Sequence, residues 1–381
     1  STMGWPEKTD LLKQFYPTSV LVTGYDIIFF WVARMLIMGM EFMKDIPFDK
    51  VFIHGLVRDS QGRKMSKSLG NGIDPLEVIE KYGADTLRFM LITGNTPGND
   101  MRFYWERVEA TRNFANKIWN ASRFALMNME GYDAEAKQAP YTLADQWILS
   151  RLQHTVKDVT ELLGRFELGE AGRLIYDFIW SEVCDWYIEL AKPRLYNKED
   201  PEARATAQHV LAEVLTSAMK LLHPYMPFIT EEIYCTLNPE EESIMIASWP
   251  EWKKEWDFKQ DEKDVEMIKE AVRSIRGVRT EMNVPPSKKA TVYVVAEDAS
   301  VRETFEKGKI FFATLASASE VLVQSDKNGI ADDAVSAVIP QAVIYIPFAE
   351  LVDVEKEIQR LEKEEWLFEN HWPDTAAPTP V

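Results

Sequence analysis

Residues 103–237 keep a helical period of apolar side chains almost throughout, and this constrains the fold more than any other feature of the 381-residue chain. The pattern predicts helices over residues 103–129, 143–164, 169–195 and 203–237. Segments that contain glycine, proline or polar residues separate them. Because long helices with short connections pack as antiparallel neighbours, we expect this region to form an all-α bundle.

A strand–helix–strand unit precedes the predicted bundle. Residues 18–23 are typical of a short buried strand that ends at Gly24, and an apolar helix follows from Asp26 to about Met43. A second strand is predicted at 51–57. This order indicates a parallel sheet of the kind found in α/β folds. The remaining elements predicted before the bundle are a polar loop and two short helices, at 58–72, 75–82 and 84–93.

The pattern changes again at about residue 261. The predicted elements there are helices at 264–283 and 300–316 and strands at 292–295, 320–324, 334–339 and 342–347. Leu351, Val354, Ile358 and Leu361 then begin a heptad seam that fails at Glu365, and residues 373–381 are expected to be disordered. The expected fold class is multidomain α/β plus all-α. Its parts are an α/β region (1–102), a helical bundle (103–260), a small α+β domain (261–350) and a truncated coiled-coil start with a tail (351–381).

The net charge of −18 argues by itself against nucleic-acid binding, but the charge is unevenly distributed. Residues 101–125 carry five basic and two acidic side chains, and Arg58–Lys67 carry four and one. Because salt screens surface charges beyond about 8 Å, such local patches decide where a polyanion binds. The sequence therefore predicts one basic helix and one basic loop.

Several classes of protein are disfavoured by composition. The two cysteines, Cys184 and Cys235, allow neither a disulfide framework nor a Cys-rich zinc site, and no metal-ligating residues are predicted. The most apolar stretch, 27–43, contains Arg34 and Glu41 and is too short to span a membrane. The N-terminus lacks the pattern of a signal peptide, so we expect a cytoplasmic location.

The strongest chemical signal is the run Lys64-Met65-Ser66-Lys67-Ser68. Two lysines and two hydroxyls on a glycine-flanked loop can follow phosphates through a reaction, because lysine is a flexible point charge. The alternative is a solvated basic loop. Its position after a strand–helix–strand unit, where α/β folds bind nucleotides, favours a phosphate site. We name residues 59–71 the signature loop.

This run matches the second signature of class I aminoacyl-tRNA synthetases, and within that class the chain resembles the bacterial valyl enzymes. Residues 4–6, 22–35 and 53–59 carry the resemblance together with the loop, and it extends to about Glu364. Isoleucyl enzymes differ around Asp26. The resemblance implies an ATP-dependent valine–tRNA ligase, monomeric, that uses valine, ATP, Mg²⁺ and valine tRNA. Residues 1–102 then resemble the second half of a Rossmann-type catalytic domain, and 103–260 an anticodon-binding domain.

The chain also departs from that family. Its five histidines do not form the family's histidine signature, and the inserted editing domain is absent. The coiled coil also stops after little more than one heptad. We therefore expect a C-terminal portion of the enzyme that is inactive alone. The alternative is a non-catalytic tRNA-binding or structural module derived from a class I synthetase.

The resemblance assigns roles to individual residues. Lys64 and Lys67 are implied to be catalytic, Trp31 to border the amino-acid pocket, and the residues that bind ATP or the adenylate to be Gly24, Asp26, His54, Gly55, Val57, Met65, Ser66 and Ser68. Chemistry alone leaves alternatives for several of these residues. Asp26 can accept hydrogen bonds from ribose hydroxyls or can cap a helix. Without the resemblance, composition alone would favour core positions for His54 and Trp31.

The helix expected at 103–126 suggests an RNA-binding face. At 100° per residue, Phe124 falls on the polar face between Lys117 and Arg123, whereas Phe114 and Trp119 fall on the apolar face. An exposed aromatic ring between cations can stack on an unpaired base while the cations bind phosphates. Packing of Phe124 against another helix is the alternative. Anticodon binding by this bundle in the family favours the first interpretation.

Overall fold

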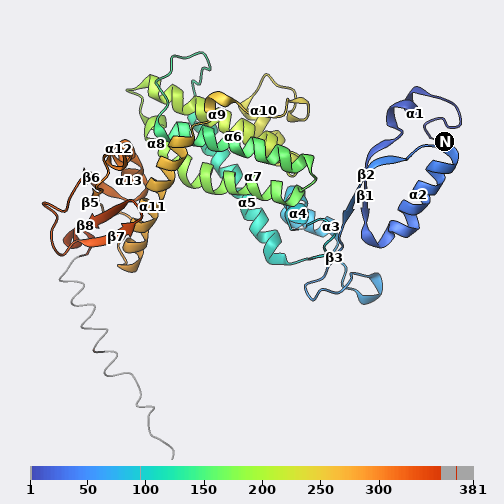
Figure 1. Cartoon of the computed structure of the whole chain (residues 1–381), viewed down its shortest axis with the longest axis horizontal. Coiled ribbons are helices and arrows are strands. Elements are labelled where there is room, and N and C mark those ends of the chain that lie inside the picture. Colours follow the sequence, from blue (N-terminus) through green and yellow to red (C-terminus); the bar gives the residue numbers. More distant parts are fainter. Residues whose placement is uncertain (1, 95, 353–365, 367–381) are drawn as a thin grey trace, which may run out of the picture. The chain divides into compact units, whose positions relative to one another are not determined.

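The structure is a computed structural model that describes residues 2–94, 96–352 and 366 (Figure 1). The chain divides into two compact units. The first comprises residues 1–140, 148–188 and 194–257, and the second comprises residues 141–147, 189–193 and those from 258 onward. No helix in the described ranges is long and apolar enough to cross a membrane.

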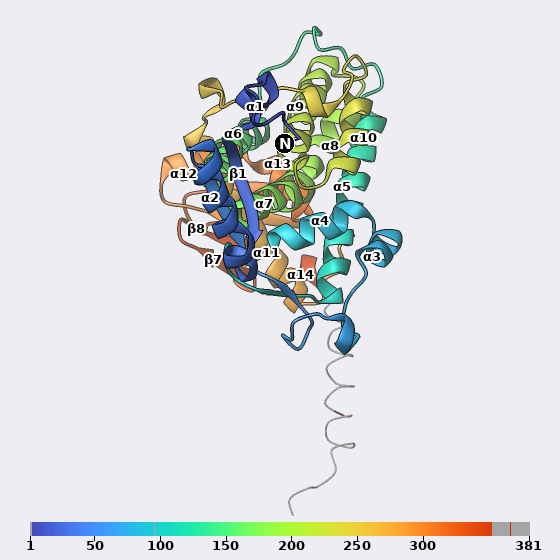
Figure 2. The same ribbon diagram turned by 90° about the vertical axis from the view of Figure 1, so that its right-hand side faces the viewer.

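The first unit begins with the predicted parallel strands. After α1 (Asp10–Phe15), β1 (Thr18–Gly24) pairs in parallel with β2 (Phe48–His54). The register places Gly24 opposite His54, so both strands end at the same edge. The helix predicted between them runs beside β1 (Figure 2) but consists of several short segments. These are a 3-10 turn at Tyr25–Ile27, π-helical turns at Ile28–Val32 and Gly39–Met43, and α2 (Ala33–Met38) between the two.

The strand predicted at 51–57 is interrupted at Gly55. β2 ends one residue earlier, and β3 (Val57–Arg58) pairs in parallel with β4 (Met101–Arg102) instead. A Cβ atom at Gly55 would lie 1.8 Å from the carbonyl oxygen of Asn99. Only glycine therefore permits this approach of the two backbones. The close approach separates the two small sheets.

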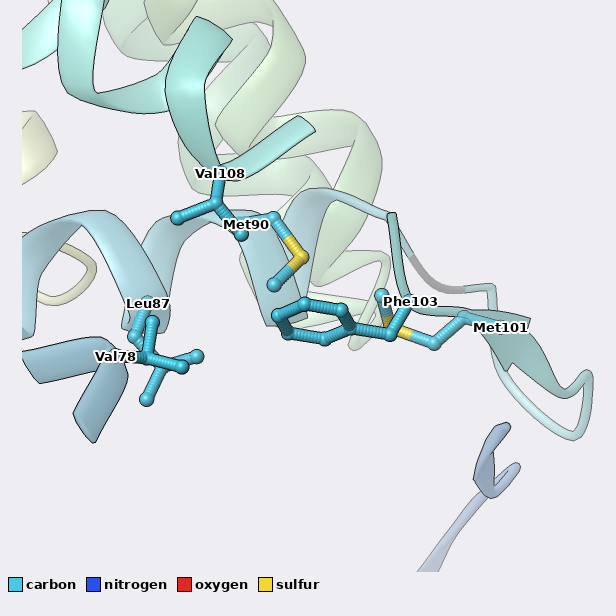
Figure 3. Packing of buried hydrophobic residues seen from close by; sticks show 6 residues of the cluster. All are labelled: Val78, Leu87, Met90, Met101, Phe103 and Val108. Atoms are coloured by element: carbon cyan, nitrogen blue, oxygen red, sulfur yellow. The ribbon is translucent and has the colours of Figure 1, made fainter. Parts of the chain in front are cut away.

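A buried apolar cluster lies beside the signature loop, and Figure 3 shows its six residues. It forms where α3 (Pro75–Tyr82) and α4 (Ala84–Thr93) meet β4 and the start of α5 (Trp105–Asn128). The cluster consists of Val78, Leu87, Met90, Met101, Phe103 and Val108. Val57 and Met65 pack against it. The base of the loop is therefore fixed to packed helices. α3 and α4 have the predicted bounds.

The bundle is built from helices that mostly follow the prediction. They are α5, α6 (Leu143–Gly164), α7 (Leu168–Asp177), α8 (Ile188–Tyr196), α9 (Pro201–Leu222) and α10 (Pro227–Leu237). The prediction of one helix over 203–237 is wrong, because Pro224 and Pro227 cannot continue the hydrogen-bond ladder of α9. Residues Phe178–Tyr187, between α7 and α8, are π-helical. Short 3-10 turns follow α10 at Ile244–Ile246 and Lys254–Trp256.

Helix α4 is hydrogen-bonded to the turn that leads into α10. The buried Asp85 carboxylate accepts hydrogen bonds from the backbone N–H groups of Phe228 (3.2 Å) and Ile229 (2.7 Å). One turn further along α4, the Arg88 guanidinium donates to the carbonyl oxygens of Pro224 (3.0 Å) and Tyr225 (3.2 Å). An anion near a helix N-terminus is favourable, because the first N–H groups have no partner within the helix. These four bonds hold α4 to the bundle.

The second unit contains the predicted α+β domain. α11 (Lys259–Glu281) comes first, and then a four-stranded sheet in the order β6-β5-β8-β7. The strands are β5 (Ala290–Val295), β6 (Ala318–Gln324), β7 (Val335–Ile339) and β8 (Ala342–Ile346). α12 (Ala299–Lys307) and α13 (Lys309–Leu315) connect β5 to β6, which is parallel to it, and α14 (Phe348–Leu351) follows β8. The heptad positions after Leu351 and the predicted tail lie outside the described residues.

Candidate functional site

The ends of β1 and β2 bring together four of the predicted site residues. Gly24 and His54 are register partners, and a Cβ atom at Gly24 would lie 2.8 Å from Asp26 Oδ1 and 3.5 Å from His54 Cε1. Lys64 reaches this edge from the signature loop, with Nζ 3.3 Å from Asp26 Oδ2. A carboxylate, an imidazole and an ammonium group therefore converge at the carboxyl ends of two parallel strands. In open α/β sheets this edge is where ligands bind.

The signature loop closes on a single buried carboxylate. Asp59 Oδ1 accepts hydrogen bonds from the backbone N–H groups of Gln61 (3.1 Å) and Arg63 (2.7 Å). Asp59 Oδ2 accepts from Arg63 Nε (2.7 Å) and from Asn71 Nδ2 (2.9 Å). The Asn71 side chain also accepts from the backbone N–H of Ser66 at 3.0 Å. Asp59 and Asn71 thus join the start, middle and end of the loop.

The tip of the loop presents Lys67 to solvent. Ser66 caps the 3-10 turn Lys67–Leu69, with its Oγ accepting from the backbone N–H of Leu69 at 3.3 Å. Ser68 Oγ lies 3.1 Å from Ser66 Oγ. The turn ends at Gly70, whose φ of +60° is a left-handed conformation that glycine adopts without strain. Within the described part of the chain, Lys67 makes no side-chain hydrogen bond or ion pair, so its charge is available to a ligand.

Asp59 gives the loop a defined pH dependence. Hydrogen bonds from Asn71 and Arg63 lower the pKa of Asp59 to about 2. A carboxylate whose pKa is lowered in the folded state stabilises that state above its unfolded pKa, near 3.9, and loses the effect as the pH falls through the lowered value. We therefore expect the loop to stay closed down to about pH 4 and to open between about pH 4 and 2.

Replacing Asp59 by alanine should open the loop at neutral pH. Four hydrogen bonds to a carboxylate would be lost, so amide hydrogen exchange of residues 64–71 should become at least about tenfold faster. Mass spectrometry of peptic peptides measures this rate. Asp49→Ala, on the exposed face of β2, is the matched control and should leave the rate unchanged. Equal exchange in the Asp59 variant and the parent would contradict this role.

The Asp100 carboxylate joins residues that follow the carboxyl ends of β1 and β2, and the sequence analysis did not predict it. This carboxylate accepts hydrogen bonds from the backbone N–H of Leu56 (2.7 Å) and from the hydroxyl of Tyr25 (3.1 Å), and it pairs with the Arg58 guanidinium. The Leu56 N–H and then the Arg58 guanidinium lower the pKa of Asp100. Asp59 and Asn71 were missed as well, although their positions at the two ends of the lysine-containing loop could have indicated a closing pair. No sequence signal pointed to Asp100.

Of four other predicted site residues, three make packing contacts and one is exposed to solvent. Gly55 packs against the backbone of residues 99–100, and Val57 and Met65 pack against the buried cluster. Trp31 lies in the π-helical turn after Asp26 and is exposed, so it is not the core residue that composition alone would favour. The structure thus brings together Gly24, Asp26, His54 and Lys64 and leaves Trp31 and Lys67 open to solvent.

On α5, the three predicted RNA-binding residues differ in their surroundings. Lys117 Nζ lies 2.6 Å from Asp185 Oδ1 and 3.7 Å from the ring centroid of Trp180. Phe124 is half-buried, and its ring meets Tyr196 edge-on with centroids 6.3 Å apart. Arg123 is exposed. The aromatic ring and one cation are therefore partly engaged within the bundle, and the other cation faces solvent.

The prediction that Trp119 faces the apolar side of α5 is wrong. Its side chain is 47% exposed. The buried side chains of α5 are Val108, Thr111, Phe114, Ile118, Ser122 and Ala125. Trp119 lies just outside the arc that they occupy, so the described helices leave about half of its side chain exposed.

Two family models match the chain. Residues 1–104 match the tRNA synthetases of class I that include the isoleucine, leucine, methionine and valine enzymes, and residues 145–294 match the anticodon-binding domain of tRNA ligases. The methionyl-tRNA synthetase of Mycobacterium tuberculosis, solved with methionyl-adenylate, has a similar fold. It is 23% identical with a TM-score of 0.52, over 61% of this chain and 46% of that one. The two parts of the chain thus match, in order, a class I tRNA synthetase segment and an anticodon-binding domain.

Within that class the relatives are valine–tRNA ligases. The chain is 58% identical to the valine–tRNA ligase of Clostridium tetani over 363 residues, which are 95% of this chain and 41% of that protein. It is 55% identical to that of Clostridium perfringens over 371 residues, 97% of this chain and 42% of that protein. Over nearly its whole length the chain is accordingly similar to valine–tRNA ligases, and it spans about two fifths of the length of these relatives.

Proposed function

We propose that this chain supplies the signature-loop half of the adenylate site and the tRNA-binding bundle of a cytoplasmic valine–tRNA ligase. The observation that carries the proposal is the convergence of Asp26, His54 and Lys64 at the ends of two parallel strands. The chain shares more than half of its aligned residues with valine–tRNA ligases, which supports valine as the amino acid. The alternative is a non-catalytic tRNA-binding or structural module.

The proposed reaction has two steps and needs no protein nucleophile. A carboxylate oxygen of valine attacks the α-phosphorus of ATP, and the bond to the bridging oxygen of pyrophosphate breaks, which gives valyl-adenylate. A terminal ribose hydroxyl of tRNA then attacks the carbonyl carbon of this mixed anhydride, AMP leaves with the bond electrons, and the hydroxyl proton is released. Catalysis of this kind depends on positioning and on stabilisation of charge.

The chain's own residues would divide this work. Lys64 and Lys67 would stabilise the negative charge that develops on the transferred and leaving phosphates, as preorganised cations do. Lys67 is free to approach them, whereas Lys64 would exchange its contact with Asp26 for one with phosphate. Trp31 would border the valine side chain. The groups proposed to contact the adenosine or the loop-bound phosphates are Gly24, Asp26, His54, Gly55, Val57, Met65, Ser66 and Ser68.

Mg²⁺ fits this proposal as a part of bound ATP rather than as a protein-held ion. The described residues contain no group of three or more His, Cys, Asp or Glu side chains that could hold a metal ion. Mg²⁺ in nucleotide sites is commonly held by substrate phosphates, waters and one or two carboxylates. Bound in this way, it would neutralise phosphate charge and leave the lysines to position the oxygens.

An exposed apolar surface supports the need for a further polypeptide at this site. The helical segment 28–43 exposes large apolar side chains, which we call the aromatic face: Phe29, Phe30, Trp31, Ile37, Met38, Met40 and Phe42. Parallel sheets are ordinarily covered on both faces, and large exposed apolar patches mark interaction surfaces. We propose that a nucleotide-binding half that carries the family's histidine signature covers the aromatic face.

Binding of valine tRNA tests the RNA-binding part of the proposal. Phe124→Ala should weaken binding by roughly ten- to a hundredfold, because base–aromatic stacking contributes about 1–3 kcal/mol. Lys117 is paired with Asp185, so Arg123 is the cation more available to phosphate. Fluorescence anisotropy with labelled valine tRNA measures the affinity.

The controls separate an anticodon site from a generic surface. Phe228→Ala, another exposed phenylalanine in the first unit, should leave the affinity unchanged. A tRNA with an exchanged anticodon should bind more weakly than valine tRNA. If both tRNAs bind equally well, the anticodon assignment is wrong. If Phe124→Ala only lowers the unfolding midpoint, the residue is a packing residue.

A further inference from the structure

From Arg112 onward one face of α5 is basic and free of acidic side chains, although the whole chain carries a net charge of −18. The acidic side chain before it on this face is Glu109, one turn before Arg112, which accepts a hydrogen bond from the Tyr82 hydroxyl at 3.5 Å. From Arg112 to Asn128 the helix contains three basic residues and no aspartate or glutamate. Side chains at intervals of four, seven, eight, eleven and fifteen residues from Arg112 share one exposed face. We call it the Trp119 face: Arg112, Asn116, Trp119, Asn120, Arg123 and Met127.

Trp119 lies at the centre of this face and is flanked by cations. Arg112 lies two turns before it and Arg123 one turn after it, so the three side chains follow one another along the helix. Neither guanidinium group forms an ion pair or a side-chain hydrogen bond with another described residue. The Trp119 ring also has no aromatic partner in the described ranges and is 47% exposed. An indole ring and two open guanidinium groups are therefore presented together.

The neighbouring Phe124 and Lys117 are less open. Phe124 meets Tyr196 edge-on, and Lys117 is held between Asp185 and the Trp180 ring. A ligand that stacks on Phe124 has to compete with these contacts, whereas one that stacks on Trp119 displaces only water. The Trp119 face is thus the better prepared of the two surfaces for a planar, negatively charged ligand.

We propose that the Trp119 face binds unpaired RNA nucleotides, with one base stacked on Trp119 and the flanking phosphates held by Arg112 and Arg123. Asn116 and Asn120 can form hydrogen bonds with base edges, because a carboxamide carries both N–H donors and an oxygen acceptor. Arg112 and Arg123 are about 16 Å apart along the helix, which suits a run of a few nucleotides. This inference deepens the proposed tRNA binding and rests on it, and it adds Trp119 as a second stacking platform beside Phe124.

The test compares two exposed tryptophans on the same helix. Fluorescence anisotropy would measure binding of the full 381-residue chain to a labelled stem-loop with the valine anticodon. Trp119→Ala should weaken binding between about five- and a hundredfold, and Trp119→Phe should restore most of the affinity. Trp105 is 45% exposed but lies next to Glu106 and packs on Phe103. Trp105→Ala should leave the affinity unchanged.

Salt dependence tests the two arginines. Arg112→Gln and Arg123→Gln should each reduce the slope of log affinity against log salt concentration by about 0.7, as expected for the loss of one phosphate contact to a single strand. A fully base-paired RNA duplex of two strands should bind the parent chain and Trp119→Ala alike. Unchanged slopes in both arginine variants would overturn the phosphate contacts.

The outcomes distinguish this inference from the proposed function. If the parent chain prefers the valine anticodon and Phe124→Ala weakens binding while Trp119→Ala does not, tRNA binding stands and the Trp119 platform is wrong. If Trp119→Ala weakens binding to every anticodon equally, the platform stands and valine-anticodon recognition falls. If the chain binds none of these RNAs, both are wrong, and a protein partner becomes the better explanation of the face.

Discussion

Replacing Lys67 by alanine is expected to slow valine-dependent exchange of pyrophosphate into ATP by about a hundred- to a thousandfold, once the chain is combined with a nucleotide-binding half. This is the range observed when one preorganised group that stabilises transition-state charge is removed. Lys67 is exposed at the tip of the signature loop and has no competing contact with another described residue. Its charge is therefore available to phosphates whose charge grows during the reaction.

The exchange assay also decides between an enzyme portion and a non-catalytic module. The chain alone should show no exchange, because in our proposal a nucleotide-binding half has to cover the aromatic face and complete the site at the strand ends. Lys44→Ala removes another exposed lysine of the same region, one whose contact is an ion pair with Glu41, and should have no effect. Exchange by the chain alone that depends on Lys67 would show that the proposed second half is dispensable. An inactive combined protein would favour the non-catalytic module.

Helix start and stop signals in the local sequence made some elements predictable. The bounds of α3 and α4 were predicted because Asp74-Pro75 begins one helix and Gly83 separates the two, signals that act within a few residues. The break in the strand predicted at 51–57 was not predictable in this way. It depends on the backbone of Asn99, which is distant in sequence and meets Gly55 only in the folded chain.

In the candidate site, too, features that depend on the local sequence were predictable, and features that depend on residues distant in sequence were not. The chemistry of the signature loop follows from its residue types, but the carboxylates that position it do not. Asp59 closes the loop through Asn71, and Asp100 joins Leu56 to Tyr25 across the strand ends. Trp119 shows a related limit. A helical wheel gives the direction of a side chain, whereas burial depends on which neighbouring helix covers that direction.

Replacing Phe114 by alanine should have the largest effect on stability. Its ring is fully buried between α4 and α7, with centroids 5.3 Å from Phe89 and 4.6 Å from Tyr176. Removing a buried phenylalanine ring costs about 3–5 kcal/mol, because the transfer free energy is lost and a cavity remains. The free energy of unfolding of the first unit, measured in urea with circular dichroism, should fall by that amount.

The aromatic face offers a matched control for the same substitution. Phe29 is 86% exposed, so Phe29→Ala should leave the free energy of unfolding nearly unchanged. It should instead reduce binding of an apolar dye, because an exposed ring is removed from the surface. A second unfolding transition from residues 258 onward should be unaffected by either variant and serves as an internal reference. Equal losses of stability in the two variants would mean that the aromatic face is covered in the isolated chain, and the proposed docking of a nucleotide-binding half onto it would then be wrong.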